Sequence, residues 1–403
     1  MEDFAKLIKE SSLIHPAAEI DFLDLTKGLF AEVDKGNVNV NYHLEFPHIA
    51  LFKYSQDCVV ERNWNKFSLM ARGLILDLQN KIVISFPYIK FFNYSEIEQG
   101  SVSFILSEFT TTEKVDGSLG ILTFYENKWR FATAGSFISD QAQWADQWMY
   151  KHMPLDKMDK NNTYLFEIIY HENKIVVNYD FEGLVLLGIV DSFGLEYTYE
   201  QLKKEASYMD TRCTKQYDFK DMESILNNAK TLNKDNEGYV IRFKNGVRLK
   251  IKGDEYVRIH RLMSRVTPIA IWESILNGDD LREIKKELPE EMEKDFDTIT
   301  FIIHEKLKVF VKEVESLYEK TKHMDDKKLG LYMQSSPKDF ENLKFKEAAR
   351  YIFLLRKNKF YESLDDFKSM VRRKIFKVFK PKANVLEGYI PSSVANRFIN
   401  NDN

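Results

Sequence analysis

The most informative residues of this sequence lie in the run Glu113-Lys114-Val115-Asp116-Gly117-Ser118, a K-x-D-G-S pattern. A lysine held in a tight polar turn, beside a carboxylate and a glycine, can present its amine as a nucleophile. Lysine is a poor nucleophile while it is protonated, so such a site must lower the pKa of the ammonium group through neighbouring cations or desolvation. Asp-Gly-Ser is also ordinary turn chemistry, and a solvated turn is the alternative interpretation.

Two acids further along the chain fit a site built around Lys114. Glu167 stands inside an otherwise apolar run, and Glu237 stands at the mouth of another one, directly before Gly238. An outward-facing position on a half-exposed strand is the alternative for Glu167. The functional interpretation is a carboxylate that accepts hydrogen bonds from a ligand hydroxyl, such as that of a ribose. Gly238 would permit the close approach of another backbone.

Lys250 and Lys252 lie on the same face of a predicted strand, because side chains alternate with period two. Two neighbouring like charges repel each other, and a solvated basic edge is the simplest interpretation. A polyanion held between them and Lys114 would turn this repulsion into binding. In that case their field is expected to depress the pKa of Lys114.

Two further cations precede Lys114. Arg72 stands before an apolar run, and Lys90 stands before the aromatic pair Phe91-Phe92. Each cation alone is as readily an ordinary surface charge, and core packing is the alternative for the two aromatic residues. These positions become informative only together with the other motifs.

The elements that must position these residues change in kind near residue 257. Before it, short β-type runs dominate, at 119–125, 129–133, 163–169, 175–179, 184–191, 238–243 and 247–251. Turns at 126–128 and 244–246 predict two hairpins, the second through Asn245-Gly246. Helices are expected at 139–152 and 218–230.

After residue 257 the apolar residues recur at mostly three- and four-residue spacing, which predicts helices. They are Phe296, Ile299, Ile302, Ile303, Phe310, Val314 and Leu317, followed by Phe345, Ala348, Ala349, Ile352 and Leu355. The expected fold is therefore α+β over residues 1–256, followed by an all-α domain over residues 257–403.

Composition excludes several classes of protein. The 403 residues include 44% hydrophobic ones and carry a formal net charge of −4, so the chain is globular and any nucleic-acid surface must be a local basic patch. Cys58 and Cys213 have no metal-ligand spacing, which favours a reducing cytoplasm. The N-terminus lacks the features of a signal peptide, and the longest apolar run, 184–190, is too short to span a bilayer. We therefore expect no membrane partner.

The motifs occur in an order that resembles the covalent nucleotidyltransferases, and most closely the ATP-dependent RNA ligases of the phage T4 RNA ligase 1 type. The resemblance rests on Arg72-Gly73, Lys90 to Asn93, Lys114-x-Asp116-Gly117-Ser118, Phe166-Glu167, Glu237 to Val240, and the stretch Lys250 to His260. DNA ligases and capping enzymes would continue with an all-β oligonucleotide-binding fold, and no such strand pattern follows residue 257. The resemblance implies an N-terminal nucleotidyltransferase domain, an ATP-grasp-like adenylation domain with antiparallel sheets.

The resemblance also implies roles for individual residues. Lys114 would attack the α-phosphate of ATP and form a lysyl-AMP intermediate, with Lys250 and Lys252 on the α-phosphate. Glu167 would hold the ribose, and Glu237 would organise Mg²⁺ or its water shell. The remaining nucleotide-binding candidates are Arg72 and Lys90 on the phosphates or sugar, Tyr54 on the nucleotide, Asp116 orienting the loop, and its neighbour Gly117.

The sequence departs from these relatives at two places. Ala134, before Gly135-Ser136, stands where phage relatives carry lysine, so a phosphate or RNA contact there would be either absent or supplied by Arg130. Lys174 stands where relatives tend to carry arginine, so a bidentate contact would be lost there.

Beyond residue 257, two features suggest ligand contacts. Asp279, in Asn277-Gly278-Asp279-Asp280, resembles an acid that binds a divalent ion in phage ligases, although Asp-Asp after Gly also suits a helix N-cap. An acid-free basic stretch would suit RNA phosphates, although a solvated helix face is its common alternative. The stretch consists of Lys368, Arg372, Arg373, Lys374, Lys377, Lys380 and Lys382.

The leading hypothesis is an ATP-dependent RNA ligase that joins 5′-phosphate and 3′-hydroxyl RNA ends, in RNA or tRNA repair. Its expected cofactors are ATP and Mg²⁺, and its expected partner is RNA such as nicked tRNA. An upstream polynucleotide kinase-phosphatase, a monomeric state and a cytoplasmic location, in a host cell if the chain is phage-encoded, are also expected. The alternatives are a DNA ligase, a GTP-dependent capping enzyme, or a non-catalytic RNA-binding protein on the same fold.

Overall fold

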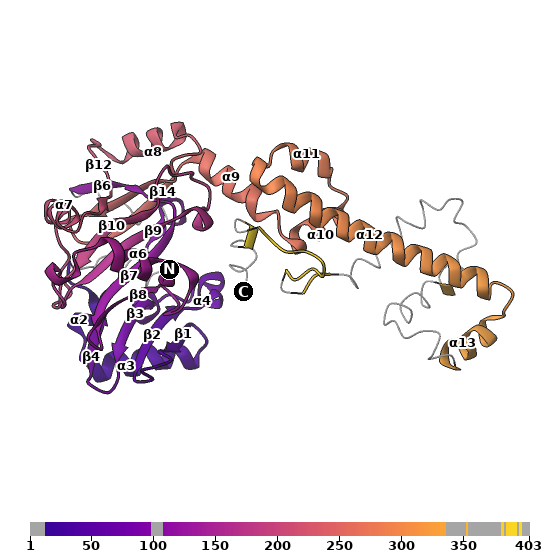
Figure 1. Cartoon of the computed structure of the whole chain (residues 1–403), viewed down its shortest axis with the longest axis horizontal. Helices are drawn as coiled ribbons and strands as arrows, with labels where there is room; N and C mark the ends of the chain where they lie inside the picture. Colours follow the sequence, from indigo (N-terminus) through magenta and orange to yellow (C-terminus); the bar gives the residue numbers. More distant parts are fainter. Residues whose placement is uncertain are drawn as a thin grey trace. The chain divides into compact units, whose positions relative to one another are not determined.

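The structure is a computed structural model that describes residues 13–97, 108–335, 352–353, 380–382, 384–392 and 395–396. The chain divides into two compact units, residues 1–260 and 261–403 (Figure 1). Each unit is described by itself below. Among the described residues, no helix combines the length and the apolar character needed to cross a bilayer.

The first sheet of residues 13–260 is antiparallel and lies near the N-terminus of the unit. Its strand order is β1-β2-β3-β4, with β1 Val38–Tyr42, β2 Ile49–Tyr54, β3 Arg72–Asp77 and β4 Ile82–Ser85. One face packs against the buried Leu25 and Leu29 of α3. The helices of this region are α2 Pro16–Glu19, α3 Phe22–Asp34, α4 Gln56–Glu61 and α5 Lys66–Met70.

The second sheet forms the centre of the unit. Its strand order is β11-β10-β9-β7-β8, with β7 Ser118–Tyr125, β8 Lys128–Thr133, β9 Thr163–Ile169, β10 Gly183–Val190 and β11 Arg212–Cys213. Helices α6 Asp140–His152 and α7 Tyr199–Tyr208 pack on it through an apolar core that includes Phe131, Ala145, Phe166 and Leu202. Ser139 caps the N-terminus of α6 by accepting from the backbone N–H of Ala142.

The third sheet carries Lys114 and Lys252, each as the last residue of a strand. Its strand order is β12-β6-β13-β14-β5, with β5 Phe92–Asn93, β6 Phe109–Lys114, β12 Gln216–Tyr217, β13 Gly238–Phe243 and β14 Arg248–Lys252. Helix α8 Met222–Thr231 covers it with Ile225 and Ala229. The 3-10 turns of the unit are η1 Tyr94–Glu96, η3 Leu155–Lys157 and η4 His171–Asn173.

The predicted α+β class and both predicted hairpins are confirmed, with two corrections. Two short edge pairings are parallel, β10 with β11 and β14 with β5. The run 175–179, predicted as a strand, has no strand structure. Its backbone N–H groups at Val176 and Val177 donate to the carboxylate of Asp116 at 2.9 Å instead of to a neighbouring strand.

From α9 onward the described elements are helical: α9 Asp254–Ser264, α10 Pro268–Asn277, α11 Leu281–Lys286, α12 Glu290–Thr321 and α13 Asp326–Ser335. Of the periodic apolar residues predicted on α12, Phe296, Ile299, Ile303, Phe310, Val314 and Leu317 are buried. Ile352 is buried too, whereas Phe345, Ala348, Ala349 and Leu355 lie outside the described residues. The all-α character of the whole C-terminal segment stays a prediction.

Candidate active site

Lys114 is the last residue of β6, and the turn Val115–Gly117 leads from it into β7. Its ammonium group forms an ion pair with Glu237, with 2.7 Å between Nζ and Oε2. Lys252 of β14 pairs with the other carboxylate oxygen of Glu237 at 2.9 Å. The Glu237 carboxylate therefore bridges two lysines that are far apart in the sequence.

Strand register explains this convergence. Gly238 on β13 is the register partner of Lys114 on β6 and also of Lys252 on β14. Gly238 has a φ of 143°, and a Cβ at this position would lie 2.0 Å from the carbonyl oxygen of Ile251. Only glycine fits there, as its position at the mouth of a strand suggested.

The protonation of Lys114 differs from the expectation. Burial alone would lower the pKa of Lys114, but the charges of Glu237, Glu167 and Asp116 outweigh it and raise the pKa. The prediction that nearby lysines depress the pKa of Lys114 is therefore wrong for the arrangement of protein groups alone. The sequence could not show that the charges of three carboxylates affect the pKa of Lys114 more strongly than the charges of the two lysines do.

The depressed lysine is Lys250. Desolvation, followed by the charges of Lys90, Lys114, Lys252 and Arg72, lowers the pKa of Lys250 to about 7. A lysine whose pKa is lowered by several like charges marks a site with a surplus of positive charge. Such a site favours a polyanionic ligand.

Glu167 completes the charged group from β9. Burial, opposed by Lys114 and assisted by Glu237 and Asp116, raises the pKa of Glu167 to about 7. The side chain lies beside the turn after Lys114, because a Cβ on Gly117 would be 2.9 Å from the Glu167 Cγ atom. Glu167 is thus a buried carboxylate next to the candidate nucleophile, not an outward-facing strand residue.

Asp116 makes its contacts with the protein itself. Oδ2 accepts the backbone N–H groups of Val176 and Val177, and Oδ1 accepts the hydroxyl of Tyr256 at 2.8 Å. These bonds fix the turn to residues 176–177 and to Tyr256, and the role of Asp116 in orienting the loop stays a prediction.

A cavity of about 480 Å³ opens beside Lys114. Its wall contains most of the predicted nucleotide-binding residues, namely Tyr54, Arg72, Lys90, Gly117, Glu167 and Lys250. Asp116, Glu237 and Lys252 do not line it. Glu237 is linked to the cavity wall through its ion pair with Lys114, and Lys252 is linked to Glu237. This volume, with its ring of cations, can accommodate a nucleotide polyphosphate.

Aromatic rings hold the cations of this cavity in place. The Lys90 ammonium lies 5.4 Å from the Tyr54 ring centroid, 5.6 Å from that of Trp64 and 5.3 Å from that of Phe92. Arg72 lies 5.3 Å from the Phe91 ring and donates to the carbonyl of Tyr88. Trp64 was not predicted, and no spacing in the sequence points to it.

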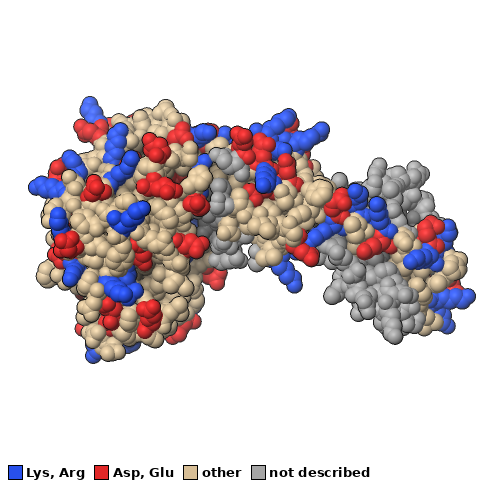
Figure 2. All heavy atoms as spheres, in the orientation of Figure 1, with Lys and Arg blue, Asp and Glu red and all other residues tan. Residues whose placement is uncertain are grey.

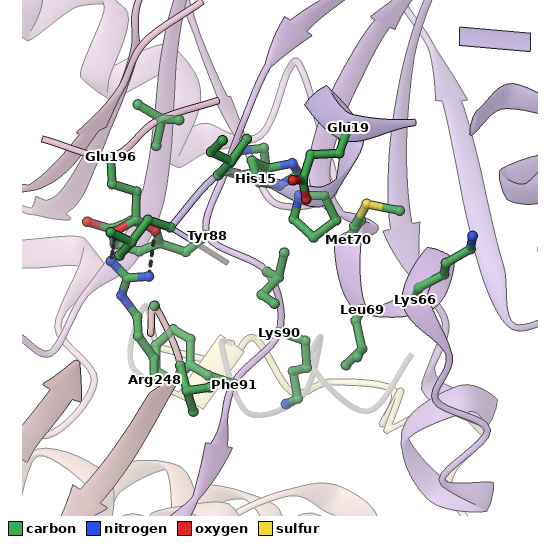
Figure 3. Close-up of a pocket in the computed structure, with 18 of the residues that line it drawn as sticks. His15, Glu19, Lys66, Leu69, Met70, Tyr88, Lys90, Phe91, Glu196 and Arg248 are labelled. Carbon is green, nitrogen blue, oxygen red and sulfur yellow. Dashed lines mark hydrogen bonds and ion pairs between the residues drawn. The ribbon is translucent and has the colours of Figure 1, made fainter. Parts of the chain in front are cut away.

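A second cavity of about 250 Å³ adjoins the first, and Tyr88, Lys90, Phe91 and Arg248 line both. Figure 3 shows Glu196 and Arg248 joined on one side of it, with Lys66, Leu69 and Met70 on the other. Arg248 lies over the Tyr88 ring at 3.6 Å and binds Glu196, which also accepts from Nε of Arg242. This partly buried ion network was not predicted, because its members come from separate segments of the chain.

Arg130 does not replace the lysine missing at Ala134. Its guanidinium group lies over the rings of Phe46 and Tyr125, and it does not line either cavity. The side chain that lies over Gly135 is Lys53, because a Cβ on Gly135 would be 2.6 Å from the Lys53 Cδ atom.

The residues predicted beyond 257 are placed only in part. Asp280 caps α11 by accepting from the backbone N–H of Arg282, which is the capping alternative. Asp279 lies between α10 and α11, and among the described residues no group of three or more His, Cys, Asp or Glu side chains surrounds it. Metal binding by Asp279 stays a prediction.

The basic stretch is described only at its end. Nζ of Lys380 lies 3.7 Å from Oε1 of Glu273 and over the Trp272 ring. The backbone of Lys382 forms an isolated antiparallel β-bridge with that of Val385. The members Lys368, Arg372, Arg373, Lys374 and Lys377 lie outside the described residues. Figure 2 shows basic and acidic side chains interspersed on the visible face of residues 13–260, in keeping with the small net charge.

Comparisons with known proteins find similarity to RNA ligases. A family model described as RNA ligase matches residues 70–256. A protein named as a bifunctional polynucleotide kinase/RNA ligase, from Autographa californica nuclear polyhedrosis virus, is 27% identical in an alignment of 236 residues that covers 52% of this chain and 33% of that protein. An RNA ligase of Rhodothermus phage RM378 is 22% identical over 343 residues, which cover 62% of this chain and 76% of the phage protein.

Solved structures that resemble this chain are less similar to it in sequence than these two relatives are. An RNA ligase of Naegleria gruberi with pyrophosphate is 18% identical, with a TM-score of 0.36 over 45% of this chain and 60% of that chain.

The chain spans a third of the length of the viral relative. The matched segment contains every predicted site residue except Tyr54 and Asp279. Residues 70–256, a little less than half of this chain, are thus similar to the RNA ligase family that the model describes.

Proposed function

We propose that this chain is an ATP-dependent RNA ligase that joins 5′-phosphate and 3′-hydroxyl RNA ends. The observation that carries the proposal is the convergence of Lys114, Glu237 and Lys252 at the edge of a cation-lined cavity. In the first step the Lys114 amine attacks the α-phosphorus of ATP. The bond to the bridging oxygen breaks, pyrophosphate leaves, and AMP stays on Nζ.

The residues of the site have separate roles in this first step. Nζ of Lys114 must lose its proton before it attacks, and Glu237, with Oε2 at 2.7 Å, holds the amine in place. Lys250 and Lys252 stabilise the charge that develops on the α-phosphoryl oxygens. Arg72 and Lys90, on the cavity wall, bind the remaining phosphates. The Glu167 carboxylate, on the cavity wall, accepts a ribose hydroxyl.

Mg²⁺ is bound by ATP phosphates together with one or two carboxylates in most such sites, and it adds positive charge beside the reacting oxygens. Glu167 and Glu237 are the carboxylates next to Lys114 that fit this role.

In the later steps AMP passes from Lys114 to the 5′-phosphate of an RNA end, and a 3′-hydroxyl then displaces it. The RNA substrate, an upstream end-healing kinase-phosphatase, a monomeric state and a cytoplasmic site of action belong to the proposal. The name of the viral relative, which pairs a kinase with a ligase, supports the second of these.

Nucleotide labelling tests the proposal. Incubation with α-labelled ATP and Mg²⁺ is expected to label the protein, whereas α-labelled GTP is not. The labelled protein is expected to seal nicked tRNA or single-stranded RNA in preference to nicked DNA. Label from GTP alone would favour a capping enzyme, sealing of nicked DNA alone would favour a DNA ligase, and no label at all would leave a non-catalytic RNA-binding protein.

Binding of ATP at pH 8 in the absence of Mg²⁺ is expected to take up protons, because Lys250 and Glu167 both have a pKa of about 7. A bound polyphosphate favours the protonated form of each group and so raises both pKa values. Calorimetric titration in buffers of different ionisation enthalpy measures this uptake.

The two groups can be separated by variants. Lys250→Met is expected to remove part of the proton uptake and Glu167→Gln another part. An uptake that is the same in Lys250→Met as in the wild type would show that the lowered pKa of Lys250 plays no part in binding.

A further inference from the structure

Tyr256 of α9 makes a buried contact with the turn that follows Lys114. Its side chain is 2% exposed, and its hydroxyl donates to Oδ1 of Asp116 at 2.8 Å. The ammonium group of Lys252 lies 5.0 Å from the centroid of its ring. Tyr256 thus touches both the turn of the candidate nucleophile and one of the two lysines paired with Glu237.

Asp116 collects hydrogen bonds from separate segments of the chain. Besides Tyr256, its carboxylate accepts the backbone N–H groups of Val176 and Val177, and its own backbone N–H donates to the hydroxyl of Tyr179 at 2.8 Å. Both carboxylate oxygens therefore have protein partners. A carboxylate used in this way positions the backbone that carries it.

The turn between Lys114 and Ser118 is also fixed from its other side. A Cβ on Gly117 would lie 2.7 Å from the carbonyl oxygen of Ile168, so the turn lies directly against β9. Tyr256 holds Asp116 from α9 while β9 limits movement at Gly117. The path of the backbone just after Lys114 is set between these two contacts.

We infer that Tyr256 is a positioning residue for Lys114, acting through its hydrogen bond to Asp116. This inference rests on the proposed function. Its consequence is specific to one step, because Lys114 is the nucleophile only when AMP is transferred to the protein. Sealing of RNA that already carries a 5′-adenylate does not need the Lys114 amine as nucleophile.

The test is the Tyr256→Phe variant, which removes the hydroxyl and keeps the ring. We expect the rate of lysyl-AMP formation at saturating ATP to fall about 10-fold, since a hydrogen bond to a charged group is lost. The ATP concentration for half-maximal rate is expected to change less than about twofold. Sealing of pre-adenylylated RNA is expected to stay at the wild-type rate.

Tyr164→Phe is the matched control. Tyr164 is 1% exposed, and its hydroxyl bonds to the backbone of Asp159, away from Lys114. The Tyr164→Phe variant removes a comparable buried hydroxyl. We therefore expect a fall in thermal stability similar to that of Tyr256→Phe, but an unchanged rate of lysyl-AMP formation. The control separates loss of stability from loss of positioning.

Two outcomes would overturn the inference. Equal slowing of both steps in Tyr256→Phe would indicate a merely structural residue, and an unchanged rate of lysyl-AMP formation would show that the contact is not needed. Failure of the proposed function looks different, because the wild-type protein itself would then take no label from ATP.

Discussion

Replacing Lys114 by alanine is expected to abolish formation of the protein–AMP adduct, with labelling from α-labelled ATP below detection. The variant lacks the only group that the proposed first step uses as nucleophile. The fold should persist, because Glu237 keeps its ion pair with Lys252 at 2.9 Å. We expect a loss of about 1–3 kcal/mol in the free energy of unfolding, measured by urea denaturation.

Lys114→Arg is the matched control for this variant. Arginine can restore a charge partner for Glu237, but a guanidinium group is not a nucleophile at any accessible pH. Stability should therefore recover towards the wild-type value while labelling stays absent. Covalent AMP in either variant would place the nucleophile elsewhere.

Replacing Glu237 by alanine is expected to cost both activity and stability. The change leaves Lys114 and Lys252 without their shared counter-charge in a site where Lys250 already has a lowered pKa. Loss of one partner from a buried charge cluster typically costs about 3–5 kcal/mol. Adenylyl transfer should fall by at least about 100-fold, because the lysines also lose their alignment.

The difference in the free energy of unfolding between the wild type and Glu237→Ala should depend on pH in a defined direction. The pKa of Glu237 is lowered in the folded protein, against the effect of burial, by Lys114 and Lys252. Its contribution is therefore present above the unfolded glutamate pKa of about 4.3 and is lost as pH falls through the folded value. The raised pKa of Lys114 gives a contribution that is present below about pH 10.4 and is lost as pH rises through its folded value.

Urea denaturation of the wild type and Glu237→Ala across this range measures the difference. It should be largest between about pH 5 and 10 and shrink towards either end. Glu255→Ala, which removes an exposed partner of Arg258, should change stability little at any pH. A wild-type-minus-variant difference that is flat from pH 3 to 11 would contradict a stabilising role of the buried charge cluster.

Local patterns predicted much of the fold around Lys114. The alternating runs on either side of Glu126 gave β7 and β8, and Asn245-Gly246 marked the turn between β13 and β14. The run 175–179 was apolar enough for a strand, but Asp116 captures two of its N–H groups. A side chain 60 residues away in the sequence decides that structure, and no local pattern contains this information.

The candidate site was predicted by residue type, but its electrostatics were not. Spacing placed Lys250 and Lys252 on one face, but it could not show that Glu237 lies between Lys252 and Lys114. The direction of the Lys114 pKa shift was therefore wrong. Trp64, Tyr256 and the Glu196–Arg248 pair were missed because each acts through a contact between distant segments.

The pairing of Lys114 and Lys252 across Gly238 has a consequence for the hairpin turn at the opposite end of β13 and β14. The distance between these two lysines spans two strand spacings, about 10 Å between their Cα atoms. A slip of one residue between β13 and β14 would turn Lys250 and Lys252 to the opposite face of the sheet. The turn at 244–246, closed by the bond from the Phe243 N–H to the Val247 carbonyl, sets that alignment. A one-residue insertion in this surface turn would therefore reach the reaction centre by changing which face of the sheet carries the lysines.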